Sequence, residues 1–240
     1  MTMLPRIDSP TFNITLPVSK IDIKIRPYTV KEQKILLMAS ESRDEDALVD
    51  TILQIVNNCV VTPINVAELP LSDVEYIFYQ LRARSQSEMV DLRYKCESKI
   101  NGQPCGNVME HQLNLLTDLE VTEGLSSTIK LTDKIGVKLK HQRFEKDPLK
   151  DVEIPSPEQL FTLIAKNVDV IFDERATYST KDLKLDDVIE FLGGLSTSQY
   201  EKIEEFFLKE PKIHKRLELT CKKCGTIHNV DVEDVFDFFI

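Results

Sequence analysis

Apolar and polar residues alternate at the start of the chain. Residues 12–16 and 21–25 each place an apolar side chain at every second position, the period of a β-strand with one buried face. Pro17 and Pro27 bound these segments, and proline is confined to sheet edges because it cannot donate a ladder hydrogen bond. The pattern predicts an N-terminal edge hairpin.

The spacing then becomes helical. Residues 29–32 and 72–75 each have the pattern of a capping box, in which a hydroxyl and a glutamate three positions later satisfy backbone donors of the first helical turn. Between them, residues 44–61 have the period of an amphipathic helix. Its predicted apolar face contains Leu48, Ile52, Ile55 and Val56. Three helices are therefore expected after the hairpin.

The alternation of apolar and polar residues that is typical of strands returns around two cysteines. Residues 89–95 alternate up to Cys96, and residues 108–115 alternate again after Cys105, which predicts a hairpin that carries both cysteines. Residues 127–144 alternate once more and predict a further hairpin.

The next part of the chain favours helices. A capping box with proline at the first helical position, at 156–159, predicts a helix through Phe172. A glycine pair ends a second helix at 183–192, and a third begins at the capping box 196–199. The pattern predicts a helical segment over residues 148–213.

Four of the five cysteines form two local pairs, Cys96 with Cys105 and Cys221 with Cys224. The second cysteine of each pair precedes a glycine, a residue that can take positive φ and turn backbone N–H groups toward sulfur. Four thiolates suit a tetrahedral zinc ion. We predict that all four cysteines hold one zinc ion. The ion is expected to be structural, because four protein ligands leave no position for a substrate.

Two alternatives to this site stay open. Eight residues, among them Asn101 and Gly102, separate the first pair, whereas two separate the second, so the first loop is expected to be the more flexible. In one alternative the first pair is incidental and the second is a redox pair or binds nothing. In the other, His111 or His228 replaces a cysteine.

No other part of the sequence predicts catalysis. Cys59 lies in the apolar segment 55–61, where burial raises the pKa of a thiol and lowers its reactivity. The histidines are scattered, and phosphate-binding and metalloprotease motifs are absent. A non-enzymatic protein is expected. Arg82, Arg84 and Arg93 form either a face for an acidic partner or ordinary solvated surface.

The composition restricts the partners. A chain of 240 residues that is 42% hydrophobic can form one or two cores. Its net charge of −10 opposes binding to nucleic acid and to anionic membranes. With no apolar run of about 18 residues and no signal peptide, the protein is expected to remain in the cytoplasm, where metal ligation is more common than disulfides.

The chain resembles a known family in the order and spacing of several motifs. These motifs are Glu190–Ser196, Gln199–Ile203, Phe206-Phe207, Pro211-Lys212, Cys221-x2-Cys224-Gly225 and Phe236–Phe239, with Leu81–Ser85 and Met89–Cys96 upstream. They are similar to those of the T-even-like myovirus (contractile-tail phage) baseplate hub and hub-assembly proteins.

The resemblance implies a component of the baseplate central hub, or a chaperone-like hub-assembly factor, that acts through contacts with phage hub or tail proteins. It implies a location in the host cytoplasm during assembly or in the tail baseplate of the virion, and leaves the oligomeric state undetermined. The alternative function is that of a zinc-ribbon regulatory protein that binds nucleic acid or a host factor, which would need a basic face.

We therefore predict an α+β protein with an N-terminal β-hairpin, a helical body and a composite zinc-ribbon-like β unit made by the two cysteine hairpins. The expected segments are 1–86 (hairpin and helices), 87–147 (β-rich, first cysteine pair), 148–213 (helical) and 214–240 (a knuckle hairpin packing on 88–115). The aromatic C-terminus either packs on Phe206 and Phe207 or anchors a partner.

Overall fold

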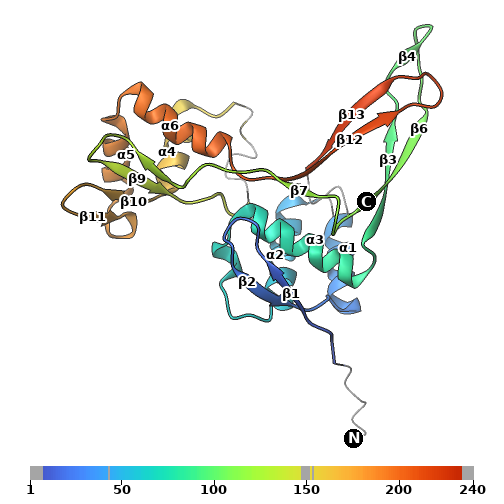
Figure 1. The fold of residues 1–240 in the computed structure, drawn as a ribbon, viewed down its shortest axis with the longest axis horizontal. Helices are drawn as coiled ribbons and strands as arrows, with labels where there is room; N and C mark the ends of the chain where they lie inside the picture. Colours follow the sequence, from blue (N-terminus) through green and yellow to red (C-terminus); the bar gives the residue numbers. More distant parts are fainter. Residues whose placement is uncertain (1–7, 43, 147–151, 153, 234–240) are drawn as a thin grey trace, which may run out of the picture. The chain divides into compact units, whose positions relative to one another are not determined.

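The computed structural model describes residues 8–42, 44–146, 152 and 154–233. The chain forms two compact units (Figure 1). Unit 1 consists of Met1–Thr122 and Lys212–Ile240, and unit 2 consists of Glu123–Pro211. Unit 2 is thus inserted into unit 1, and the boundary at Thr122 falls inside the segment 87–147. The predicted α+β class, with its N-terminal hairpin, is confirmed. The predicted position of the aromatic C-terminus lies outside the described residues.

The N-terminal hairpin pairs β1 (Phe12–Thr15) with β2 (Asp22–Ile25) in antiparallel register. Its inward side chains, among them Ile23, are buried. The loop between the strands is held by Asp73, whose carboxylate accepts hydrogen bonds from the backbone N–H groups of Val18 at 2.8 Å and Ser19 at 2.9 Å.

Helices follow the hairpin in unit 1, as predicted. They are α1 (Val30–Glu41), α2 (Glu45–Cys59), the 3₁₀ helix η1 (Val66–Glu68) and α3 (Leu71–Ser85). The capping box at Thr29 is confirmed, since its hydroxyl and the Glu32 carboxylate exchange bonds with each other's backbone N–H. All four residues of the predicted apolar face of α2 are buried.

The predicted capping box at 72–75 is wrong. Helix α3 begins at Leu71, after Pro70, so Ser72 and Asp73 lie within its first turn and are buried. A tertiary contact accompanies this difference from the prediction. The Asp73 carboxylate binds the β1–β2 loop, whose residues lie 54 and 55 positions earlier in the chain.

Two long antiparallel hairpins carry the cysteines. In one, β3 (Met89–Lys95) pairs with β6 (Val108–Asn114), and in the other, β12 (Ile213–Thr220) pairs with β13 (Ile227–Val232). The short strand β7 (Glu120–Val121), which the pattern did not predict, pairs with the start of β12.

The described residues of unit 2 form a four-stranded antiparallel sheet and three α-helices. The strand order is β11-β10-β9-β8, with β8 at Thr128–Lys130, β9 at Gly136–Leu139, β10 at Val168–Phe172 and β11 at Thr177–Ser179. The helices are α4 (Pro157–Lys166), α5 (Leu185–Gly193) and α6 (Thr197–Leu208), with the 3₁₀ helix η2 (Thr180–Asp182). Buried side chains of the sheet and of the helices, such as Val137, Leu192 and Phe206, form one core.

The predicted helix through Phe172 is a helix followed by a strand. The capping box at Ser156 is confirmed, but α4 ends at Lys166 and residues 168–172 form β10. These residues are mostly β-branched or aromatic, and β10 lies between β9 and β11, where such side chains pack well. The segment 148–213 is therefore not wholly helical.

No helix in the described part of the chain is both long enough and apolar enough to cross a lipid bilayer.

Candidate metal centre

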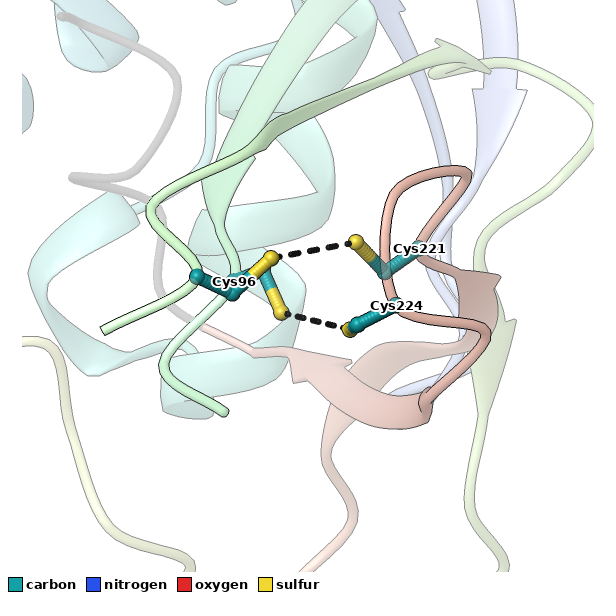
Figure 2. A group of neighbouring side chains, drawn as sticks. Cys96, Cys221 and Cys224 are labelled. Atoms are coloured by element: carbon teal, nitrogen blue, oxygen red, sulfur yellow. Dashed lines mark hydrogen bonds between the residues drawn. The ribbon is translucent and has the colours of Figure 1, made fainter. Parts of the chain in front are cut away.

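Four cysteine side chains meet where the tips of the two long hairpins lie together. The sulfur atoms of Cys96, Cys105, Cys221 and Cys224 all lie within 4.8 Å of one another. Cys96 Sγ is 3.6 Å from Cys224 Sγ, and Cys105 Sγ is 3.8 Å from Cys221 Sγ. Figure 2 shows Cys96 facing the loop that carries Cys221 and Cys224. Residues 116 and 128 positions apart in the chain are thus brought into contact.

These separations fit a metal tetrahedron and not a disulfide. Zinc binds thiolate sulfur at about 2.3 Å, which places the corners of a regular tetrahedron about 3.8 Å apart. A disulfide would need about 2.05 Å, and all five cysteines are free. Cys96, Cys105 and Cys221 are buried and Cys224 is half-buried. The four side chains can therefore hold one metal ion, with little solvent access.

The knuckle of the second hairpin is closed by backbone hydrogen bonds. Cys221 N–H donates to the Thr226 carbonyl at 2.9 Å, and Gly225 N–H donates back to the Cys221 carbonyl at 2.8 Å. Gly225 has a φ of 72°, in the left-handed region that favours glycine. The Cys-Gly sequence is thus what allows the chain to turn tightly under the sulfur atoms.

The first hairpin repeats this turn. Cys96 N–H donates to the Asn107 carbonyl at 2.7 Å, and Gly106 N–H, at a φ of 64°, donates to the Cys96 carbonyl at 3.1 Å. The strands next to the two turns also pair in the same register. In each hairpin, the residue before the first cysteine faces the second residue after the glycine. These pairs are Lys95 with Val108 and Thr220 with Ile227. The two hairpins are therefore repeats of one unit.

The longer loop between Cys96 and Cys105 is itself a small hairpin. Within it, β4 (Lys99–Ile100) pairs with β5 (Gln103–Pro104). Asn101 and Gly102 both have positive φ, 50° and 80°, as a two-residue type I′ turn requires. The loop therefore has a regular hairpin conformation, and its greater flexibility stays a prediction. Asn-Gly between short strands is a turn signal, and this signal could have been used at the sequence level.

The chain matches the model of the family described as T4 bacteriophage base plate protein over residues 9–240. The chain belongs to this family. The matched range covers both units and all four clustered cysteines, so the predicted resemblance to a phage baseplate protein is confirmed. A place in the central hub stays a prediction. A search of the curated proteins and a search of the solved structures gave no match.

In this baseplate protein, the surroundings of three clustered cysteines shift the pKa values of their thiols in different directions. A hydrogen bond with the Thr226 hydroxyl and one from the Thr226 backbone N–H lower the pKa of Cys224 to about 6, and the N–H of Cys224 lowers the pKa of Cys221. The Asn107 N–H acts to lower the pKa of Cys105, but burial and the three neighbouring thiols together raise it to about 11. Metal binding to such a cluster displaces the remaining protons.

Neither histidine considered as a substitute ligand belongs to the cluster of four. His111 faces Leu92 in the β3–β6 register, beyond the knuckle. His228 is close, with Nε2 at 3.2 Å from Cys96 Sγ, yet the group of mutually close ligand atoms consists of the four cysteines among the described residues.

Other candidate residues have local roles. Cys59 is fully buried, as predicted, and burial raises the pKa of its thiol to about 12. The three arginines make separate contacts within the chain. Arg82 donates to the Ser87 carbonyl, Arg84 bonds Gln80 and stacks over Phe12, and Arg93 pairs with Glu110.

One partly buried ion pair was not predicted. Arg26 and Glu32 form a two-pronged contact, with N–O distances of 2.8 and 3.0 Å, and Arg26 also donates to the Asn58 carbonyl at the end of α2. The hydrogen bonds from Arg26 are the main reason why the pKa of Glu32 falls to about 2. The pair joins β2, α1 and α2.

Proposed function

We propose that this baseplate protein is a non-enzymatic component or assembly factor of the central hub and acts through contacts with other hub or tail proteins. The observation that carries the proposal is the family match over residues 9–240. The chemistry of the cysteine cluster supports it, because a metal with four protein ligands has no position for substrate or activated water.

The proposal includes one structural zinc ion. Four thiolates are a common ligand set of structural zinc sites, and the 3.6 and 3.8 Å sulfur separations match the zinc tetrahedron. The ion would tie the hairpin of β3 and β6 to that of β12 and β13, and so hold the segment after unit 2 to the segment before it.

The outward face of α1 is the surface that we assign to partner contact. Val30 and Met38 on this face are 84% and 62% exposed, and Leu37 is also exposed. Lys31 and Lys34 lie among them, and both are exposed. Large apolar side chains gathered on one face of a helix favour a protein contact over bulk solvent. Lys31 and Lys34 outweigh the exposed Glu41 on this face, whereas the chain as a whole has a net charge of −10, so the face fits an acidic and apolar surface of another baseplate protein.

Replacing Leu37 and Met38 by serine should leave folding intact and block incorporation of the protein into baseplates. Exposed substitutions usually change stability by no more than about 0.5 kcal/mol. If the two side chains are hot spots of the interface, truncating each costs about 2 kcal/mol or more, which exceeds a tenfold loss of affinity. The measurement is the yield of assembled baseplates when the variant complements a phage that lacks the protein.

The matched control is Leu208→Ser, since Leu208 is 82% exposed at the end of α6 in unit 2. It should assemble like the unsubstituted protein. Normal assembly of the α1 double variant would remove α1 as the contact surface. Self-association or binding to anionic vesicles that depends on the same two residues would assign the face to a second copy or to a membrane instead. Mass spectrometry of purified virions would then separate a hub component from an assembly factor.

The alternative function in nucleic acid binding has one observation in its favour. Exposed lysines, Lys95, Lys99, Lys222 and Lys223, surround the knuckles. Four thiolates bound to a divalent ion have a net charge of −2, which offsets part of the positive charge of these lysines. We expect no binding to single- or double-stranded DNA at about 150 mM salt. A titration at several salt concentrations would reveal DNA binding, because an affinity that depends on phosphate contacts falls steeply as the salt concentration rises.

A further inference from the structure

We infer that His228 is a positioning residue for the metal centre, which donates a hydrogen bond from Nε2 to the Cys96 thiolate and thereby raises the affinity of the site for zinc. The inference rests on the zinc proposed above. It concerns a side chain outside the four ligands, placed 132 residues after the sulfur that it contacts.

The strand geometry directs His228 toward the other hairpin. His228 lies on β13 opposite Leu219, and it alternates with exposed neighbours, so that it shares the more buried face with Val230 and Val232. Its ring is half-buried, and Nε2 lies 3.2 Å from Cys96 Sγ. This distance suits an N–H group that points at a sulfur acceptor, for which the neutral imidazole with its proton on Nε2 is sufficient.

The repeat supplies an internal comparison. His228 is the fourth residue after Cys224. The fourth residue after Cys105 in the other hairpin is Met109, which is buried and whose side chain has no hydrogen-bond donor. Both hairpins form the same knuckle in the same register. A histidine is therefore not needed to build the hairpin, and its presence at this position is explained by the sulfur that it faces.

Other sulfurs of the cluster have polar partners too. The Asn107 amide donates to Cys221 Sγ at 3.5 Å, and the Thr226 hydroxyl lies 3.3 Å from Cys224 Sγ. Four thiolates around one zinc ion carry a net charge of −2, which hydrogen-bond donors near the sulfurs spread and stabilise. Loss of such a partner typically lowers metal affinity by about 10- to 100-fold.

The test compares zinc affinities of full-length variants by competition with a chelator at fixed pH. His228→Met installs the residue of the other hairpin and should weaken zinc binding by about 10- to 100-fold. His228→Gln keeps an N–H donor at a similar distance and should recover most of that loss. Asn229→Ala changes an exposed neighbour on the opposite face and should bind like the unsubstituted protein.

A second measurement does not depend on how the variants fold. In the unsubstituted protein loaded with ¹¹³Cd, NMR should show a protonated Nε2 on His228 and a scalar coupling from that proton to the metal through the Cys96 sulfur. Zinc X-ray absorption should show four sulfur neighbours. Three sulfurs and one nitrogen would make His228 a ligand and overturn the inference.

The remaining outcomes separate the two proposals. Unchanged affinity in His228→Met, with zinc still bound to four sulfurs, would overturn the role of His228 and leave the zinc site standing. Failure of the unsubstituted protein to bind zinc at all would overturn the site, and the inference with it.

Discussion

Replacing Cys221 by serine is expected to abolish metal binding and to lower the melting temperature of unit 1 by about 10 °C or more. Binding of a structural zinc contributes directly to folding, and a loss of about 4 kcal/mol corresponds to about this shift in a chain of this size. The sulfur cluster is where the hairpin tips meet. The measurements are zinc content by mass spectrometry and calorimetric melting.

The same change at Cys96 should have the same effect, which tests whether the two pairs share one ion. Unit 2 has its own core, so its transition should stay in place while that of unit 1 moves. Lys222→Ala, an exposed change between two ligands, serves as the control. If Cys96→Ser kept its zinc and its melting temperature, the first pair would not be part of the site.

Replacing Glu32 by glutamine is expected to lower the free energy of unfolding by about 2–4 kcal/mol at pH 7. The substitution removes the charge that faces Arg26, and leaving one partner of a largely shielded ion pair alone is costly. Both side chains are largely shielded, at 25% exposed for Arg26 and 12% for Glu32. The amide can still accept one hydrogen bond from Thr29, so the helix cap is partly retained.

The effect should depend on pH in a defined direction. The folded pKa of Glu32 is about 2, below its ordinary value of 4.5, so its contribution is present above pH 4.5 and is lost as the pH falls toward 2. Urea unfolding of both proteins across this range should show the difference closing. Glu205→Gln, which breaks the exposed pair with Lys209, should cost less than about 0.5 kcal/mol. A difference that did not change with pH would contradict the role of the ion pair.

The elements that the sequence predicted well depend on neighbours in the chain. The capping boxes at Thr29 and Ser156 are correct because both partners of each bond lie within one helical turn. The hairpins are correct because their apolar period is two on both strands.

The errors arose where distant contacts outweighed local preference. Residues 168–172 form a strand because β9 and β11 flank them on both sides. Ser72 is not a helix cap, because its helix starts earlier and the adjacent Asp73 binds the β1–β2 loop. The Arg26–Glu32 pair joins three elements, and no period or motif in the sequence could have predicted it.

By itself, the sequence indicated the two knuckles, since the glycine after the second cysteine of each pair permits the positive φ that such a tight turn needs. It also contained the order of motifs by which the family was predicted. Only the tertiary structure decided that the two pairs meet and that His228 lies beside Cys96, because more than a hundred residues and the whole of unit 2 separate these positions along the chain. Contacts of that range depend on how complete elements pack, which no local pattern encodes.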